Sequence, residues 1–226
     1  PTMPRPDADT PTFTPRATCA RCRRPKAYCW CPHLVSLPTR TRVVLLQHPR
    51  ERGLAIGTAH MASLCLPDAE LHVGTTWGDS PALARALSDP DRPAVLLYPG
   101  AGAVDLLTHP PDGPVTLVVV DGTWSTARKV VARNPVLSSL PRYALSPPAP
   151  GEYRIRREPT AACVSTLEAL VYALGALERD PERFRAMLAP FRAMIDAQLA
   201  AEATLHNHRG RAPRPPRPPR PRPPSP

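Results

Sequence analysis

Four cysteines near the start of the chain have a spacing that suits a metal ion. They lie in the segment CARCRRPKAYCWC as Cys19, Cys22, Cys29 and Cys31, a C-x2-C pair followed by a C-x-C pair. Each close pair points two thiolates at one ion, and two pairs complete the tetrahedral four-sulfur shell that zinc prefers. Four thiolates leave no position open for a substrate, so the pattern predicts a structural zinc rather than a catalytic one.

Two other interpretations of the cluster remain open. Disulfides are one alternative, although the short mixed spacings and a cytosolic setting argue against them. An iron–sulfur cluster is the other, but the spacings typical of such clusters differ from this one. The remaining cysteines, Cys65 and Cys163, lie in apolar helical surroundings and are predicted to be core residues.

Basic side chains alternate with these cysteines, and no acidic residue occurs between Pro11 and Gln47. Part of this charge offsets the dianionic zinc–thiolate centre. The excess, with Tyr28 and Trp30 interleaved, is typical of a module that grips a phosphate backbone and stacks on bases. We therefore expect RNA contacts from Arg21, Arg23, Arg24 and Lys26.

A second chemical motif follows an apolar run in the middle of the chain. The segment VTLVVVDGTW ends this run on a lone acid, Asp121, followed by Gly122, Thr123 and Trp124. Gly122 permits close backbone approach, and Thr123 or Ser125 can cap a helix whose N-terminus favours negative charge. Asp121 is either a functional carboxylate or a helix N-cap, and Trp124 is either a core side chain or one that stacks on a ligand.

Alternating strand and helix patterns position this motif. Apolar runs predict strands of a parallel sheet, at residues 42–48, 70–74, 94–100, 115–122 and 141–145. Helical patterns lie at 54–66, 81–88, 124–133 and 165–178, and then at 181–205 as one or two helices broken near Pro190. Ser165 and Glu168 have the spacing of a capping box. The predicted fold class is α/β, a mostly parallel sheet covered by helices on both faces.

Several unusual segments lie where such a sheet binds ligands, beyond the carboxyl ends of its strands. They are QHPRE at 47–51, YPGAG at 98–102, DGTW at 121–124 and, before the capped helix, YRIRREP at 153–159. Their convergence predicts one small-molecule site. His48 is predicted to be a structural hydrogen bonder there, not a catalytic residue.

The net charge of +10 is unevenly distributed. Six of the 29 basic residues lie in the Arg/Pro-rich tail from Arg209 to Arg222, and without them 23 basic residues face 19 acidic ones. The Pro-rich residues 1–16 and the tail at 206–226 are predicted to be disordered. The tail is either a product of compositional bias or an RNA tether. No apolar run approaches the roughly 18–20 residues of a membrane span, so a soluble, cytoplasmic protein is expected.

Taken together in this order, the motifs resemble the DTW-domain family of tRNA-uridine aminocarboxypropyltransferases. The resemblance runs from Cys19 to Glu178 through the four cysteines, LLQHPRERGLAIGTA, LLYPG, the D-x-T-W signature, ARK, YRIRREP and STLEAL. It implies a SPOUT-like, trefoil-knotted fold that binds S-adenosylmethionine (SAM) in a deep loop pocket. The chain then divides into a disordered N-terminus (1–16), a zinc module (17–38), a SAM-binding DTW domain (39–205) and the tail (206–226), which lies outside the family pattern.

The resemblance also implies transfer of the 3-amino-3-carboxypropyl group of SAM to N3 of a tRNA uridine, with methylthioadenosine leaving. N3 is protonated at neutral pH, so the reaction needs a base, and Asp121 is the candidate. SAM contacts are expected from Leu97, Tyr98, Pro99, Gly100, Asp121, Gly122, Thr123, Trp124, Ile155, Arg156, Glu158, Ser165 and Thr166. Further RNA contacts are expected from Arg50, Arg128 and Lys129. The expected partners are SAM and tRNA, and a monomer is expected.

Two other classes of function remain as alternatives. A SAM-dependent RNA methyltransferase of SPOUT type would use the same pocket but transfer the methyl carbon, leaving S-adenosylhomocysteine. A non-catalytic zinc-containing RNA-binding protein would bind RNA without SAM, and Asp121 would be dispensable.

Overall fold

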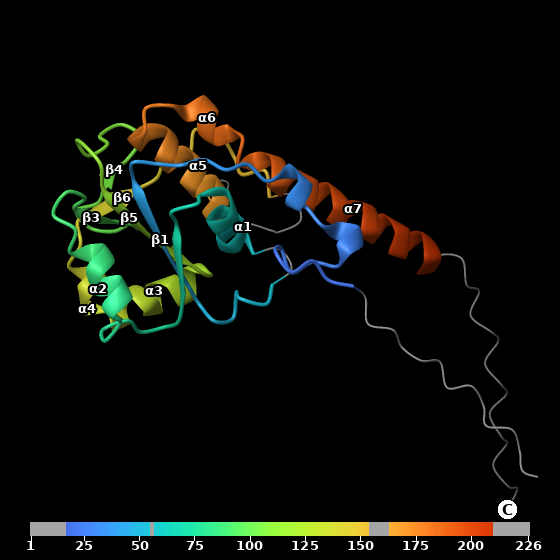
Figure 1. Ribbon diagram of the computed structural model, residues 1–226, viewed down its shortest axis with the longest axis horizontal. Coiled ribbons are helices and arrows are strands. Elements are labelled where there is room, and N and C mark those ends of the chain that lie inside the picture. Colours follow the sequence, from blue (N-terminus) through green and yellow to red (C-terminus); the bar gives the residue numbers. More distant parts are fainter. Residues whose placement is uncertain (1–16, 55–56, 154–162, 210–226) are drawn as a thin grey trace, which may run out of the picture.

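The computed structural model describes residues 17–54, 57–153 and 163–209 (Figure 1). Its strands form one six-stranded sheet in the order β2-β1-β5-β3-β6-β4. Every neighbouring pair is parallel, so all carboxyl ends lie at one edge. The strands are β1 (Arg42–Gln47), β2 (Glu70–Val73), β3 (Ala94–Leu97), β4 (Val104–Asp105), β5 (Thr116–Asp121) and β6 (Arg142–Ala144).

Helices cover both faces of the sheet, which gives three layers (Figure 1). One face packs against α2 (Pro81–Leu87), α3 (Trp124–Arg133) and α4 (Pro135–Ser138). The other packs against α1 (Thr58–Cys65), α5 (Thr166–Leu177), α6 (Pro181–Arg185) and α7 (Leu188–Arg209). Two short 3-10 helices, Lys26–Tyr28 and Cys31–His33, contact α7.

The alternation of side chains along the central strands divides the core in two. In β5, Leu117 and Val119 pack in the core with α1 and α5, whereas Val118 packs in the core with α2 and α3. In β1, Val43 and Leu45 follow the first pattern and Val44 the second. Because successive side chains of a strand point to opposite faces, both faces must be apolar, which explains the continuous apolar runs.

Helix α5 is fixed at both ends. At its start, the Ser165 side chain accepts a hydrogen bond from Glu168 N and the Glu168 side chain accepts one from Ser165 N, which confirms the predicted capping box. At its end, Glu178 Oε1 accepts from Thr41 N at 2.8 Å and from Thr41 Oγ1 at 2.6 Å. Glu178 Oε2 accepts from Arg40 N at 3.3 Å. The end of α5 is therefore anchored at the start of β1.

The parallel helix-covered sheet and its five predicted strands are confirmed, and α3 has the predicted bounds. The last segment forms two helices, as the predicted break implies, but they separate at residues 186–187, a few residues before Pro190. Pro190 itself lies in the first turn of α7, where proline is tolerated. The predictions missed α4 and β4, and α7 continues to Arg209, past the predicted start of the tail. Within the described ranges, no helix is both long and apolar enough to cross a membrane.

Replacing Glu178 with Gln tests the anchor of α5. Burial acts to raise the pKa of Glu178, but hydrogen bonds from Thr41 and Arg40 hold it below its ordinary value of 4.5. A carboxyl group with a lowered pKa stabilises the fold above the pKa of the unfolded state, and this contribution disappears as the pH falls. Glu178→Gln should therefore cost about 1–3 kcal/mol in the free energy of unfolding at pH 7.

The difference in the free energy of unfolding between Glu178→Gln and the wild type should become smaller below about pH 4, as measured by urea unfolding across pH. Glu182→Gln is the matched control, because the Glu182 side chain is 75% exposed in its pair with Arg185. It should change stability by about 0.5 kcal/mol or less. Equal effects of the two substitutions at pH 7 would contradict the anchoring role.

Candidate functional site

The four cysteines come together as a compact thiol cluster. Their Sγ atoms all lie within 4.8 Å of one another. The distances are 3.7 Å between Cys19 and Cys31 and 3.6 Å between Cys22 and Cys29. Zinc–sulfur bonds of about 2.3 Å in a tetrahedral shell give sulfur–sulfur edges of about 3.8 Å, close to these values. All six cysteines are free thiols, so the geometry fits a metal shell and excludes disulfides.

Backbone hydrogen bonds and burial act in opposite directions on the thiols of this cluster. N–H groups of Cys22 and Arg21 lower the pKa of the Cys19 thiol from 9.0 to about 6. Burial, reinforced by the neighbouring thiols, raises the pKa of Cys31 from 9.0 to about 12. Four close thiols thus oppose full ionisation of the set, and a divalent cation would favour the thiolate at each position.

The thiol cluster packs onto the α/β body. Cys22 and Trp30 are buried in the same core as α1, α5 and α7. The Nε2 atom of His60, on α1, hydrogen-bonds to the carbonyl oxygen of Arg21 at 2.9 Å. The turn that carries Cys19 and Cys22 is therefore held against a helix of the main fold.

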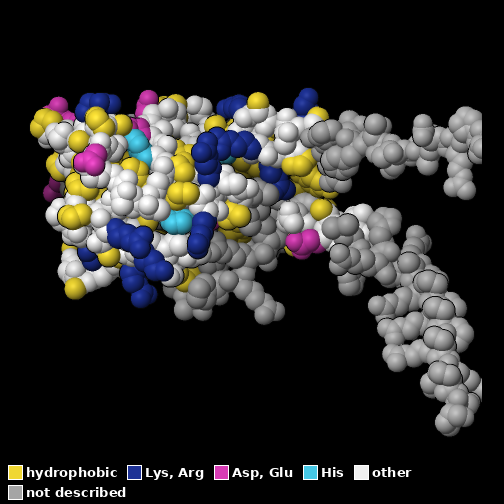
Figure 2. Space-filling view, turned by 90° about the horizontal axis from the view of Figure 1, so that it is seen from below, with side chains coloured by type: hydrophobic (Ala, Val, Ile, Leu, Met, Phe, Trp, Pro, Cys, Tyr) yellow, Lys and Arg dark blue, Asp and Glu magenta, His cyan; other side chains and the backbone are white. Residues whose placement is uncertain are grey.

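Most of the basic residues predicted to contact RNA are exposed, namely Arg21, Arg23, Lys26, Arg50, Arg128 and Lys129. Arg24 is a correction to that prediction, because it is only 5% exposed and offers little surface to an RNA chain. Figure 2 shows Lys and Arg side chains gathered in clusters on one face, with only scattered acidic side chains. Such a face attracts a polyanion.

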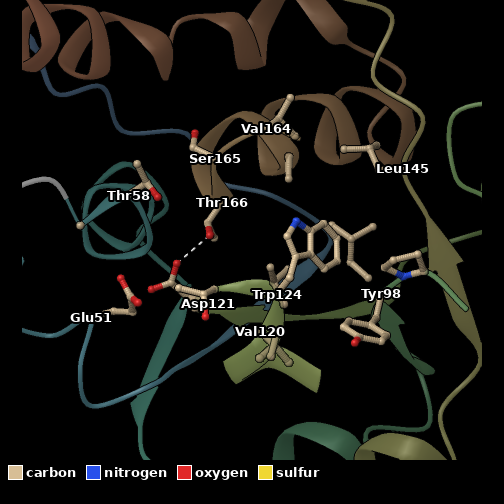
Figure 3. A pocket seen from close by; sticks show the side chains of 18 of the residues that line it. Glu51, Thr58, Tyr98, Val120, Asp121, Trp124, Leu145, Val164, Ser165 and Thr166 are labelled. Atoms are coloured by element: carbon tan, nitrogen blue, oxygen red, sulfur yellow. Dashed lines mark hydrogen bonds between the residues drawn. The ribbon is translucent and has the colours of Figure 1, made fainter. Parts of the chain in front are cut away.

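A cavity of about 470 Å³ opens at the carboxyl edge of the sheet (Figure 3). The ends of β3 and β5, the segment after β1 and the first turns of α1, α3 and α5 all contribute to its lining. Its volume is typical of small-molecule sites, which run from about 300 to 1,000 Å³. The cavity lies where the sequence predicts a ligand.

Most of the predicted SAM-binding residues line this cavity: Leu97, Tyr98, Pro99, Asp121, Gly122, Thr123, Trp124, Ser165 and Thr166. Gly100 is not among the lining residues; it has φ +154°, and a Cβ there would lie 2.9 Å from Arg142 Nη1. The predictions for Ile155, Arg156 and Glu158 fall outside the described residues.

Asp121 ends β5 with its carboxylate held from two sides. The residue is 6% exposed. Its Oδ1 accepts a hydrogen bond from Thr166 Oγ1 at 2.6 Å (Figure 3), and its Oδ2 accepts one from Gln47 Nε2 at 3.0 Å. Thr123 caps α3, since its side chain accepts from Thr126 N. Asp121 is therefore not the N-cap, and its carboxylate belongs to the cavity.

Two aromatic side chains form another part of the lining (Figure 3). Trp124 is 49% exposed, so it is not a core side chain. Its ring centroid lies 6.4 Å from that of Tyr98, and its Nε1 donates to Cys163 Sγ at 3.4 Å. The pair presents aromatic surface on which a planar ring can stack.

Sequence reasoning missed Glu51, which lies near Asp121 on the same side of the cavity in Figure 3. Its position after β1, in the QHPRE segment, was the available signal. Among the described lining residues, Glu51 and Asp121 are the only side chains charged at neutral pH, so this lining suits a cation. The other lining residues that were not predicted are Leu54, Gly57, Thr58, Val119, Val120, Ser125, Ala127, Tyr143, Leu145, Tyr153, Val164 and Ala169.

Glu168 ties together two stretches of chain beside the cavity. It is 3% exposed, and its carboxylate accepts from Glu152 N at 2.5 Å and from Ser165 N at 2.8 Å. Glu152 in turn forms two hydrogen bonds of 2.7 Å with the Arg192 guanidinium. The described residues on either side of 154–162 are therefore fixed to α5 and α7.

These features define an α/β protein with a small-molecule cavity at the carboxyl edge of a parallel sheet and a separate cluster of four cysteines that could hold a metal ion. Residues 16–199 match the family described as DTW domain, and the chain belongs to this family.

Named relatives support the assignment. The chain is 34% identical over 203 residues to tRNA-uridine aminocarboxypropyltransferase 2 of Drosophila melanogaster, covering 86% of this chain and 80% of that protein. It is 32% identical over 191 residues to the Mus musculus protein of the same name, covering 81% of this chain and 64% of that protein. For tRNA-uridine aminocarboxypropyltransferase A of Arabidopsis thaliana the identity is 29% over 217 residues, with 81% of each chain covered. No solved structure shows a significant match.

The thiol cluster predicts that purified protein contains about one zinc ion per chain. Cys22→Ser removes a buried ligand, so the variant should lose the metal and unfold at a lower temperature. Cys65→Ser, at a buried cysteine outside the cluster, is the control and should retain zinc. Elemental analysis and thermal unfolding with and without a chelator provide the measurements. Metal-free wild-type protein whose unfolding temperature is unaffected by zinc or chelator would contradict the site.

Proposed function

We propose that this protein transfers the 3-amino-3-carboxypropyl group of SAM to N3 of a uridine in tRNA. The observation that carries the proposal is the Asp-Gly-Thr-Trp segment, which contributes both a carboxylate and an indole to a cavity at the carboxyl edge of the sheet. The chain's membership of the DTW-domain family and the names of its relatives support the reaction and its substrate.

The chemistry of the cavity is compatible with SAM. SAM carries a positively charged sulfonium and an adenine ring. The two carboxylates, Glu51 and Asp121, would attract the positive charge, and Tyr98 and Trp124 offer surface to the ring. The remaining contacts proposed for SAM come from Leu97, Pro99, Gly122, Thr123, Ser165 and Thr166, and the N-terminus of α5 suits its carboxylate.

The proposed role of Asp121 is to accept the N3 proton. Bound SAM would supply an electrophilic carbon next to its sulfonium. N3 forms a bond to this carbon as the carbon–sulfur bond breaks, the bonding electron pair stays on sulfur, and methylthioadenosine leaves. The N3 proton passes to the Asp121 carboxylate, so charge and atoms balance. Because a sulfonium has three carbons open to attack, orientation must select the carboxypropyl carbon, and positioning of this kind is worth about 7–11 kcal/mol.

Other parts of the proposal concern architecture and partners. We infer that zinc holds the turn at 17–38, that 39–205 form the catalytic domain, and that the sheet is of the knotted SPOUT type. The wholly parallel sheet with its cavity at the carboxyl edge supports the last inference. Free thiols at all six cysteines fit a reducing compartment such as the cytoplasm. The exposed basic residues of the zinc module would hold tRNA, with the target base splayed out of its stack because pairing hides N3.

Asp121→Asn tests the proton acceptor. The substitution preserves the shape but removes the base, so turnover should fall by about 10²–10⁴-fold while SAM still binds. Asp105→Asn is the control, since Asp105 also ends a strand of this sheet but does not line the cavity. Nucleoside mass spectrometry of tRNA and chromatography of the SAM-derived product provide the measurements. Near wild-type turnover of Asp121→Asn contradicts the base role, and formation of S-adenosylhomocysteine indicates methyl transfer instead.

Removing charge from the zinc module tests the RNA surface. Replacing Arg21, Arg23 and Lys26 with Ala should weaken tRNA binding at least about tenfold even at low salt. The slope of the logarithm of the binding constant against the logarithm of the salt concentration should become shallower by about 0.7–0.9 per lost phosphate contact. SAM affinity should be unchanged. The control replaces three exposed basic residues elsewhere, Arg85, Arg179 and Arg185, with Ala.

Truncation after Arg209 tests the contribution of the Arg/Pro-rich tail to tRNA binding. An arm of Arg and Pro adds sequence-independent attraction but cannot place one base in a cavity. The truncated protein should bind tRNA modestly more weakly and modify the same uridine. The opposite result would be a truncated protein that modifies a different uridine and a zinc-module variant that behaves like the wild type. It would mean that the tail, and not the zinc module, positions the tRNA.

A further inference from the structure

Gln47 is a buried polar side chain at the end of an apolar strand. It is 2% exposed and follows four buried apolar residues of β1. Burying a carboxamide is unfavourable unless it is hydrogen-bonded, and the Nε2 atom of Gln47 donates to Asp121 Oδ2 at 3.0 Å. The ladder between β1 and β5 pairs the two residues directly. Gln47 therefore bonds with the carboxylate to which the proposed reaction assigns the proton.

The Asp121 carboxylate is held by two neutral donors from different elements. Thr166 of α5 donates to Oδ1 at 2.6 Å and lines the cavity. Gln47 donates to Oδ2 but is not among the lining residues. The hydrogen bond to Asp121 therefore links the Gln47 side chain to the cavity.

We propose that Gln47 is a positioning residue, whose carboxamide orients the Asp121 carboxylate so that it can accept the uridine N3 proton. This inference rests on the proposed function. A neutral donor suits the task because it stabilises the anion without a full positive charge, which would weaken the base. A glutamate at this position would instead share a proton with Asp121, since two carboxylates at hydrogen-bond distance resist joint ionisation.

Several other titratable groups surround Asp121. His48 and Glu51 follow β1, and the backbone N–H of His48 donates to the Asp121 carbonyl at 3.0 Å. Other titratable side chains of the described lining and of the first turn of α5 are Tyr98, Tyr143, Tyr153 and the buried Glu168. Substitutions of Gln47 leave all of them in place, so a difference from the wild type reports the Asp121 carboxylate.

The test compares the pH dependence of kcat/KM for tRNA in the wild type, Gln47→Met and Gln47→Glu. Met has a similar length but no donor, so the acidic limb of its profile should move to higher pH, with roughly tenfold more activity lost between pH 8 and pH 6 than in the wild type. Gln47→Glu should shift further in the same direction. SAM binding at pH 8 should remain within about threefold of the wild type for Gln47→Met, because the carboxylate is then ionised.

Gln198→Glu is a matched control. Gln198 Nε2 also donates to a carboxylate, Glu202 Oε1, at 3.2 Å, but this pair is exposed on α7. The same substitution there places two carboxylates together away from the cavity. Its pH profile should coincide with that of the wild type.

Thermal unfolding across pH gives a readout that does not depend on turnover. In Gln47→Glu, the paired carboxyl groups retain a proton in the folded state that the unfolded state releases, so stability relative to the wild type should fall as the pH rises from 5 to 8. Gln198→Glu should show little of this trend. Folded Gln47→Met and Gln47→Glu proteins that keep the wild-type activity profile would overturn the positioning role alone. Wild-type protein that transfers nothing to tRNA would overturn the proposed function and this role with it.

Discussion

The parallel register of β1 against β5 is the constraint on which the site depends. The ladder begins with Arg42 opposite Thr116 and ends with Gln47 opposite Asp121. Because side chains alternate, Asp121 continues the row of Leu117 and Val119 that faces α1 and α5. A slip of one residue would turn this carboxylate toward the layer of α2 and α3. The apolar residues on both faces of these strands therefore specify where the acid lies.

Helix α5 completes the arrangement because it is anchored at both ends. Its capping box fixes the first turn, and Thr166 in that turn reaches the carboxylate on β5. Glu178 at the other end accepts hydrogen bonds from the chain just before β1. Glu168 also binds Glu152 N, so the chain preceding residue 154 is held against the same turn. The helix thus contacts the chain before β1 at one end and the Asp121 carboxylate of β5 at the other. These contacts fix its first turn, which lines the cavity, relative to both strands.

The sequence was sufficient for features that depend on local chemistry. Continuous apolar runs predicted the long strands, and the Ser165 and Glu168 spacing predicted the start of α5. Features that depend on register or packing were not predictable in this way. Gln47 and Glu51 become part of the site only when β1 lies beside β5, although a glutamine in an apolar strand was a signal. Arg24 looks like its neighbouring arginines in the sequence, but folding of the cysteine turn buries it.

The distribution of charge makes the proposed transfer physically consistent. The described lining of the cavity is anionic, whereas the exposed side chains of the cysteine turn are cationic, so a sulfonium and a polyanion are attracted to different places. In the proposed step, a sulfonium and a carboxylate are replaced by a neutral thioether and a neutral carboxylic acid. Loss of opposite charges is least opposed by solvent where water is scarce, and Asp121 is 6% exposed. Methylthioadenosine would also lack the positive charge that the carboxylates attract, so the same lining that favours binding of the donor would favour release of its product.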